Sequence, residues 1–576
     1  MIINQSGGGK KPTGTINITT NGTHDVSSYA NADVLVPTTA PEYYIPLTTS
    51  GNEMLKGSIT QIPSGGSATN IGQRVLYYAW YYDNTGTTQN VDWSGVTSIQ
   101  DYGCAYALSY CSVVGSVDLS NLTFINSTGL QQAFAYSSIT SLDLRNLETL
   151  SMGNAMGTAC RGCTSLTSVN FNKLKTISGA NAFSSTFRDC TALTSMSFPA
   201  LQTITASLSN TFTGCSGLTS VSFPSLATIN GGGTSVFSST FSNCTSLTTF
   251  AFGATDIAVS GNNAFSSTFS GCTNLATLDL TSITSISGGT SSQPVMNNIC
   301  PSCPSLTTVK FGQLKRVDTY GLYRTFASVS SLTTVTFDFP LGSTSTHTSG
   351  TTLSNTFESS GITTIPAASF AENINYNGFV LKNTFQNCLG LTTLDLSNIK
   401  TVSVAALNQT FTGCTNLTSV DLSNLESATA TDAFQQTFKD CTSLASVNFA
   451  KLKQIGNSGS ANTNPVFRLA FNNCTSLTSV SFPLLDTLAG GALQWTFSGC
   501  THLANIYFNS LNSGSFVAST GNVQLTSIIS GVTGCTLHFP SNLDPQGGST
   551  VISSLDGYPN FGGTNTVLAF DLPATA

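Results

Sequence analysis

Apolar side chains recur along most of this chain at a fixed spacing. The segment 186–198 reads Thr-Phe-Arg-Asp-Cys-Thr-Ala-Leu-Thr-Ser-Met-Ser-Phe, and close counterparts begin at Thr268, Thr410 and Thr437. The position of its Cys is repeated at 111, 137, 163, 190, 215, 244, 272, 303, 329, 360, 388, 414, 441, 474 and 500. Dividing the span from 111 to 500 by its 14 intervals gives a mean period of about 27.8 residues. Self-similarity of this kind predicts a stack of repeated coils rather than separate globular domains.

Each repeat contains two short apolar patterns. The first, Phe-x-x-Cys-x-x-Leu-x-x-Val-x-Phe, ends in an alternation that predicts a short strand with one buried face, as at 196–198. The second, Leu-x-x-Ile, turns the chain along another side of the coil, as at 201–204. Turns rich in Gly and Asn, such as 230–233, let the chain return. About 15 such coils, stacked at about 4.8 Å each, predict a curved solenoid roughly 70 Å long.

The repeat resembles the BspA-like class of leucine-rich repeats, which is found in bacterial and protist surface proteins and in phage proteins. The resemblance covers about residues 100–512 and rests on the core Phe-x-x-Cys-Thr-Ser-Leu-Thr-Ser-Val, seen at Cys163, Cys244, Cys441 and Cys474. It implies a β-rich repeat solenoid, a right-handed stack of about 15 leucine-rich coils.

Some repeats depart from this pattern. Ser137, Val329 and Ser360 stand where other repeats have Cys, and the repeats at Ser137 and Ser360 lack one residue before the next apolar position. We expect these departures to disturb packing locally and to leave the register of the stack intact.

The two ends of the chain differ from the repeats, so the chain is expected to have four regions. They are a small β module for attachment at 1–40, a linker and aromatic cap at 41–100, the solenoid at 101–512 and a C-terminal cap at 513–576. The first region predicts two or three short strands around an Asn-Gly turn. It also resembles a short module at the starts of phage virion proteins and prophage-encoded proteins of gut bacteria, and the C-terminal region resembles the ends of phage-associated repeat proteins. The residues that match the N-terminal module are Gly14, Thr15, Ile18, Asn21, Gly22, Asp25 and Val26.

The composition of the chain argues against two classes of binding partner, nucleic acids and anionic membranes. Charged residues make up 8% of the chain and the formal net charge is −7, so nucleic-acid binding and binding to anionic membranes are not expected. No apolar run is long enough to cross a membrane, and the N-terminus lacks the apolar run of a secretory signal. Synthesis in a bacterial cytoplasm without classical secretion is therefore expected.

The 16 Cys residues do not predict a disulfide framework. Twelve occupy the repeat position, where Cys is expected to act as a small buried hydrophobic residue in a column of free thiols. Two Cys-x-x-Cys pairs, Cys160 with Cys163 and Cys300 with Cys303, leave zinc binding or redox chemistry open as an alternative.

No catalytic arrangement or cofactor motif is found, so neither enzyme activity nor a cofactor is expected. The four His residues (His24, His347, His502 and His538) are interpreted as solvated polar residues. Five Asp residues share one outward strand position and are candidates for contacts with a ligand: Asp118, Asp143, Asp279, Asp395 and Asp421. We expect them not to lie on consecutive coils, which argues against a glycosidase pair of carboxylates.

These observations favour a non-enzymatic virion protein, such as a phage tail fibre, head fibre or decoration protein. It would bind other virion proteins (capsid, tail or fibre components) through its N-terminus and a host cell-surface protein or glycan through the solenoid. A bacterial surface or secreted BspA-like adhesin is the alternative, and a spacer without a ligand is a third reading. Three long insertions at one phase of the repeat, 288–294, 342–351 with His347, and 456–465, are candidate binding loops.

Overall fold

The computed structural model describes residues 93–574 with internal gaps, and three short strands before residue 93: β1 (Thr15–Asn17), β2 (Asp33–Leu35) and β3 (Asn70–Ile71). The gaps fall at 94–95, 112–114, 233–234, 339–340, 342–351, 375–380, 403, 457–464, 490–491, 513–524, 526, 545–562 and 564–565. The chain is a parallel β-solenoid of about 15 turns with almost no helix, which confirms the predicted fold class. It divides into two compact units, an N-terminal unit (1–283 and 299–306) and a C-terminal unit (284–298 and 307–576).

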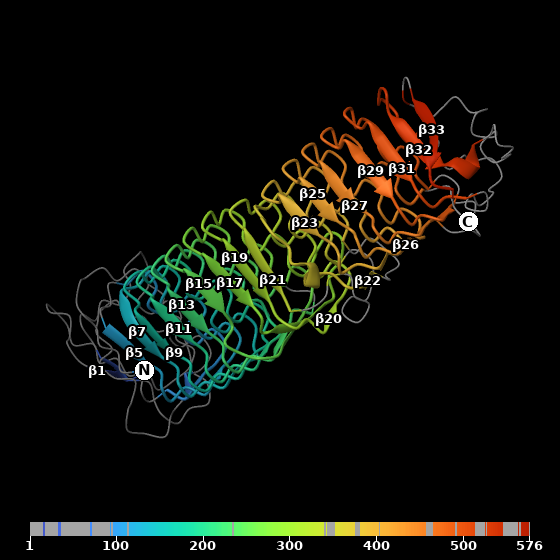
Figure 1. Ribbon diagram of the computed structural model, residues 1–576. Helices are drawn as coiled ribbons and strands as arrows, with labels where there is room; N and C mark the ends of the chain where they lie inside the picture. Colours follow the sequence, from blue (N-terminus) through green and yellow to red (C-terminus); the bar gives the residue numbers. More distant parts are fainter. Residues whose placement is uncertain are drawn as a thin grey trace. The chain divides into compact units, whose positions relative to one another are not determined.

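The N-terminal unit is built from two rows of short parallel strands. The first row follows the Val-x-Phe pattern and contains β5 (Gly115–Asp118), β7 (Ile139–Asp143), β9 (Ser168–Asn170), β11 (Ser195–Ser197), β13 (Ser220–Ser222), β15 (Thr249–Ala251) and β17 (Thr277–Leu280). The second row follows Leu-x-x-Ile and contains β4 (Ser98–Ile99), β6 (Phe124–Ile125), β8 (Thr149–Leu150), β10 (Thr176–Ile177), β12 (Thr203–Ile204), β14 (Thr228–Asn230) and β16 (Ile257–Ser260). Equivalent residues of successive coils face each other, as Met196 faces Val221 and Ile177 faces Ile204. Figure 1 shows the strands of the first row side by side.

The C-terminal unit repeats this architecture. Its first row contains β19 (Thr308–Phe311), β21 (Thr334–Phe337), β23 (Thr393–Asp395), β25 (Ser419–Asp421), β27 (Ser446–Asn448), β29 (Ser479–Phe482), β31 (Asn505–Phe508), β32 (Thr536–Pro540) and β33 (Val567–Leu572). Its second row contains β18 (Ile283–Ser287), β20 (Arg316–Val317), β22 (Asn373–Ile374), β24 (Thr401–Val402), β26 (Ser427–Ala428), β28 (Gln454–Ile455) and β30 (Thr487–Leu488). Two 3₁₀ turns, η1 (Ala367–Ser369) and η2 (Ser541–Leu543), are the helical elements of the described residues.

The core of each unit is a set of columns in which one residue type stacks on itself from coil to coil. In the N-terminal unit the ring of Phe212 lies between those of Phe187 and Phe241, with centroid separations of 5.8 Å and 5.6 Å. All three rings are fully buried. In the C-terminal unit Phe411 stacks in the same way between Phe385 and Phe438. No single coil could bury such a column, so the stability of each coil depends on its neighbours.

The third side of each coil is a run of turns with a regular hydrogen-bond pattern. Between residues 102 and 111, alternate N–H groups close turns within the coil, as Ala105 donates to Tyr102. The N–H groups between them donate to the next coil, as Cys104 donates to Gly129. Every fourth residue has a left-handed backbone, with φ of 55° at Tyr102, 58° at Tyr106 and 60° at Tyr110. We call this surface the turn side of the solenoid.

Polar side chains also bind one coil to the next inside the core. The buried Thr that precedes the repeat Phe donates to a carbonyl of the preceding coil, as Thr240 Oγ1 does to Leu208 O at 2.9 Å. The repeat Cys does the same, as Cys244 Sγ does to Phe212 O at 3.2 Å. The interpretation of Cys as a hydrophobic residue alone was therefore incomplete, because its thiol also serves as a weak donor between coils.

The irregular repeats disturb the structure locally. The register between β5 and β7 shifts between Gly115 and Ser116, within the repeat at Ser137. Regular pairing of β5 with β7 continues beyond this point, where Val117 faces Leu142. In the repeat at Ser360 no first-row strand forms, and η1 follows Pro366 instead. Pro has no N–H to donate to a ladder, which accounts for the missing strand.

Two short strands lie in the N-terminal region, on either side of the Asn-Gly sequence. β1 and β2 pair in parallel, with Ile16 facing Val34. Parallel strands cannot be joined by a two-residue turn alone, so β1 and β2 do not form a simple hairpin about Asn21-Gly22. Strand β3 pairs in parallel with β4, and so continues the second row of the N-terminal unit.

An alternating row of charges follows the second row of the C-terminal unit. The charged residues of this row occupy equivalent positions on successive coils: Glu372, Lys400, Glu426, Lys453 and Asp486. Each is linked to the preceding coil by a backbone hydrogen bond, in which its N–H donates to the carbonyl of the preceding member of the row, as Lys400 donates to Glu372. Lys400 forms an ion pair with Glu372. The hydrogen bond and the charge of Glu372 raise the pKa of Lys400, and Glu426 adds to this effect. Neighbouring coils therefore carry opposite charges at this position.

The thiol column gives a first testable prediction. Burial raises the pKa of Cys215 to about 12 and raises the pKa values of Cys190 and Cys244 well above the ordinary value. Because a thiol alkylates only as the thiolate, these residues should not react with iodoacetamide in the folded protein at pH 8. In denaturant without a reductant, mass spectrometry should find all three alkylated. Disulfide-linked peptides at these positions would contradict the prediction.

Candidate functional site

The five candidate Asp residues lie at the ends of first-row strands, and the structure corrects their predicted separation. Asp118 faces Asp143 directly on the next coil, and Asp395 faces Asp421 in the same way. Asp279 faces Ala251 and has no acidic neighbour in that pairing. Asn170 continues the first pair and Asn448 continues the second, so each unit carries a row of Asp-Asp-Asn. We call these the Asx rows.

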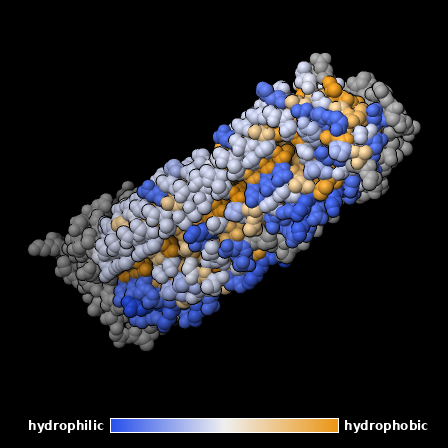
Figure 2. Space-filling view, viewed as in Figure 1, coloured by the Kyte–Doolittle hydropathy of each residue, from blue (hydrophilic) through white to orange (hydrophobic). Residues whose placement is uncertain are grey.

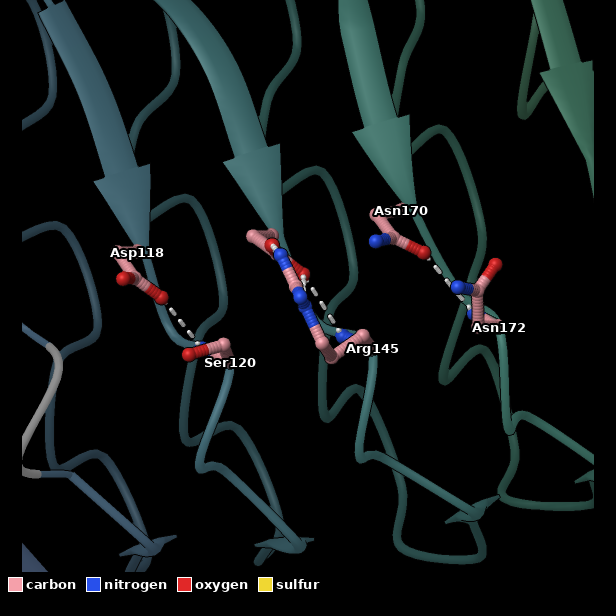
Figure 3. Close-up of polar contacts among 6 residues, drawn as sticks. Asp118, Ser120, Arg145, Asn170 and Asn172 are labelled. Atoms are coloured by element: carbon pink, nitrogen blue, oxygen red, sulfur yellow. Dashed lines mark hydrogen bonds and ion pairs between the residues drawn. The ribbon is translucent and has the colours of Figure 1, made fainter.

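Each Asx side chain ends its strand by binding its own backbone. The Oδ1 atom accepts the N–H of the residue two positions on, at 2.9 Å for Asp118 and Ser120 and 3.2 Å for Asn170 and Asn172. Figure 3 shows this contact on successive coils. Asp395 and Asp421 make the same bond at 2.9 Å. Asp and Asn share this geometry, in which a side chain closes a turn after a strand. The Asx rows therefore have a structural role in every coil where they occur.

The second carboxylate oxygen of each Asp remains available for other contacts, and neighbouring carboxylates about 4.8 Å apart repel each other. In the N-terminal unit Arg145 forms a bidentate ion pair with Asp143, which lowers the repulsion between the carboxylates of Asp118 and Asp143. In the C-terminal unit the amide of Asn448 donates to Asp421 Oδ1 at 3.2 Å. The rows thus combine hydrogen-bond acceptors with a few donors in a regular order, as a recognition surface needs.

The surface next to the Asx rows is built from hydroxyl groups. Two residues before each Asx position stands Ser or Thr, as at Ser116, Ser141 and Ser168 in the N-terminal unit and Thr393 and Ser419 in the C-terminal unit. Figure 2 shows a broad area of intermediate hydropathy on the visible face, with strongly hydrophilic areas beside it. Such a face can bind through many weak hydrogen bonds.

One predicted solvated His proved to be a structural residue. His538, on β32, directs Nδ1 to the Asp571 carboxylate at 2.9 Å and Nε2 to Asn505 Oδ1 at 3.0 Å. Its ring also stacks on Tyr507, and its side chain is only 13% exposed. Because both ring nitrogens are engaged, this His–Asp pair links three coils and does not present a free base. His538 and Asp571 lie far apart in the sequence, so their contact could not be recognised from the sequence alone.

The Cys-x-x-Cys alternative gains no support from the geometry. Cys160, Cys163, Cys300 and Cys303 are buried and unbridged. Burial raises the pKa of Cys160 well above its ordinary value, whereas hydrogen bonds from Cys160 and Ser137 lower the pKa of Cys163 against the effect of burial. Within the described residues, no group of three or more His, Cys, Asp or Glu side chains is placed to hold a metal ion. The described part of the chain also has no helix with the length and hydrophobicity of a membrane span.

The other candidate residues fall mostly outside the described residues. Thr15 lies in β1, whereas Gly14, Ile18, Asn21, Gly22, Asp25 and Val26 of the attachment segment are not among the described residues. His347 and the insertion at 342–351 are also outside them, as is most of 456–465. The insertion at 288–294 is described and is mainly exposed. The attachment segment and the loops therefore stay predictions.

The repeat region of the chain matches the model of a known protein family. The model of the BspA-type leucine-rich repeat region, with 6 copies, matches residues 69–186, 130–275, 184–322, 379–466 and 436–533, which together exceed half of the chain. The chain belongs to this family. A search of curated proteins found no match.

Solved structures similar to this BspA-type protein are found at low sequence identity and low TM-score. A leucine-rich repeat protein from Bacteroides ovatus is 18% identical, with 82% of this chain and 87% of that chain covered and a TM-score of 0.34. A leucine-rich cell surface protein from Faecalibacterium prausnitzii is 16% identical, with 75% and 83% covered and a TM-score of 0.21. The pneumococcal vaccine antigen PcpA is 13% identical, with 80% and 89% covered and a TM-score of 0.22.

A pair of substitutions in this BspA-type protein separates the structural role of the Asx rows from a role in binding. Asp421→Asn keeps the Oδ1 acceptor for Ser423, so we expect no loss of stability. Asp421→Ala removes it and should lower the free energy of unfolding by about 1 kcal/mol. Denaturant titration of both variants measures the difference. A ligand that needs the carboxylate would bind Asp421→Asn more weakly, whereas unchanged binding would limit Asp421 to the turn.

Proposed function

We propose that this protein is a non-catalytic virion component of a phage, a head fibre, tail fibre or decoration protein, that presents its solenoid for adhesion to a host-cell surface. BspA-type leucine-rich repeat proteins are typically non-catalytic binding scaffolds, which supports the binding part of the proposal. The Asx rows, whose side chains are exposed or half-buried, and the hydroxyl groups beside them would supply a recognition face in each unit. The loops at one phase of the repeat supply a second candidate face.

The virion part of the proposal is carried by the thiol column. Sixteen buried and unbridged Cys residues suit a protein that is made and assembled in a reducing cytoplasm. The resemblance of residues 1–40 to a module of phage virion proteins supports attachment through that segment. A bacterial surface adhesin is the second candidate, favoured by family membership.

Deletion of residues 1–40 tests the attachment. Particles assembled with the full chain should contain it, as measured by mass spectrometry of purified virions. The shortened chain should be absent from particles while its far-ultraviolet circular dichroism and melting temperature stay unchanged. Incorporation of the shortened chain would show that the attachment assignment is wrong. Full chain found on the surface of cells that make no particles would instead establish the adhesin alternative.

A further inference from the structure

The last strand of the first row in the C-terminal unit has one edge without a described partner. β33 pairs with β32 along one edge, and no strand of the described residues pairs with the other. Figure 1 shows β33 beyond β32 at the end of the row. With six residues, β33 is also the longest of the described strands. An unpaired strand edge carries a row of backbone N–H and C=O groups, which favours pairing with another strand.

The apolar columns of the C-terminal unit also end at this strand. On β32, Leu537 is 0% exposed and Phe539 is 1% exposed. Leu568 faces Leu537 from β33, and the ring of Phe570 stacks on that of Phe539 at 5.9 Å. Leu568 and Phe570 are nevertheless only half-buried, and Val567 is 52% exposed. A stack of repeats needs its terminal apolar face covered, so this end of the columns points to a further partner.

Contacts with β32 hold β33 in place. The backbone N–H of Val567 donates to Cys535 O at 3.0 Å. The only charged side chain of the strand, Asp571, contacts Nδ1 of His538 at 2.9 Å and so is engaged by β32. The register shifts between His538 and Pro540, so pairing with β32 is regular over the first part of the strand. That part of β33 is therefore ordered without a second partner.

The free edge of β33 complements itself. Because Val567 directs its N–H to β32, Leu568 and Phe570 direct their backbone groups to the free edge. If a second copy lay antiparallel with a two-fold axis at Ala569, Leu568 of each copy would face Phe570 of the other. Such facing residues exchange both backbone hydrogen bonds, and their side chains would continue the apolar columns. Asp571 would face Val567 of the second copy, so the two carboxylates would not meet.

We propose that two copies of this chain pair antiparallel through β33, with the two-fold axis at Ala569. A two-fold contact requires a surface that complements itself. β33 meets this requirement in its backbone groups, in its apolar side chains and in the separation of the two carboxylates. An unrelated strand would share only the backbone groups. The pairing goes beyond the proposed adhesive function and does not depend on it.

Cross-linking of the full chain tests the pairing and its register. The Cα atoms of Ala569→Cys in the two copies would lie about 4.5 Å apart, within reach of a disulfide. Val567→Cys is the matched control, because this position is more exposed but would lie roughly 14 Å from its counterpart. After mild oxidation with diamide, non-reducing electrophoresis should show about 10-fold more cross-linked chain for Ala569→Cys than for the control. Cys535 should not react, because burial raises its pKa to about 12.

Ala569→Glu gives an independent measurement. It sets two carboxylates directly against each other across the axis, and like charges in that position destabilise a strand pair. Sedimentation in the micromolar range should give twice the mass of one chain for the full chain, and the mass of one chain for the variant. Far-ultraviolet circular dichroism and the melting temperature should show that the variant is folded.

Three results would overturn the proposed pairing. The first is a full chain that sediments as a monomer throughout the micromolar range. The second is equal or stronger cross-linking of Val567→Cys, the order expected from random collisions of exposed thiols. The third is a dimer that persists in Ala569→Glu, which would place the association elsewhere in the chain.

Discussion

Phe212→Ala is expected to lower the free energy of unfolding by about 3–5 kcal/mol, the range for deleting a buried aromatic ring. Phe212 is fully buried and stacks on Phe187 and Phe241, so the cavity would open between three coils. Because each coil of a solenoid contacts mainly its neighbours, the loss should appear as an early transition in the coils around residue 212. Hydrogen exchange along a denaturant series would locate it.

Phe212→Leu is the control for this substitution. It keeps most of the apolar contact while removing the ring stack, so its effect should be clearly smaller. Equal losses in the two variants would mean that ring stacking, rather than filled volume, stabilises the column. A loss below about 1 kcal/mol for Phe212→Ala would contradict the packing described for the core.

Gly179→Ala should cost more than about 2 kcal/mol, because overpacking against a backbone cannot relax by rotating a side chain. A Cβ added at Gly179 would lie 2.2 Å from Met152 O and 2.5 Å from Met152 C, on the preceding coil. The N–H of Gly179 also donates to Leu150 O at 3.0 Å, which holds the two coils at this distance. Thermal unfolding monitored by circular dichroism measures the loss.

Gly232→Ala provides the matched comparison. Nothing lies within 4 Å of a Cβ at Gly232, but its φ of +49° is left-handed. The expected cost is about 1 kcal/mol, from backbone strain alone. If Gly179→Ala proved as mild as Gly232→Ala, the coils near residue 179 would have to separate more easily than their hydrogen bonds suggest.

Much of the fold could be predicted from the sequence, because burial in a stacked coil imposes a strict spacing on apolar residues. The Val-x-Phe and Leu-x-x-Ile patterns became the two rows of strands. The turn side was not foreseen, since residues such as Tyr106 carry no sign of the left-handed backbone that hydrogen bonds to the next coil impose. The donor role of Cys244 was missed for a similar reason, because a weak thiol bond depends on which carbonyl the next coil brings near.

The Asx rows show where the sequence held more than we inferred from it. Asp118 and Asp143 are 143 − 118 = 25 residues apart, close to one repeat, so their position on adjacent coils could have been recognised. Their bonds to the backbone two residues on also follow from the ordinary behaviour of Asp after a strand.

A chain made of nearly interchangeable coils must avoid folding with one coil left out. Along the alternating charge row, omission of the coil that holds Lys400 would bring Glu372 against Glu426, about 4.8 Å away. Omission of the coil that holds Glu426 would bring Lys400 against Lys453. Either mistake sets like charges side by side and is disfavoured. Omitting two coils would restore the alternation, but it excludes twice as much chain from the stack. Because these side chains are exposed, the preference for the correct coil order should be small and should weaken further at high salt.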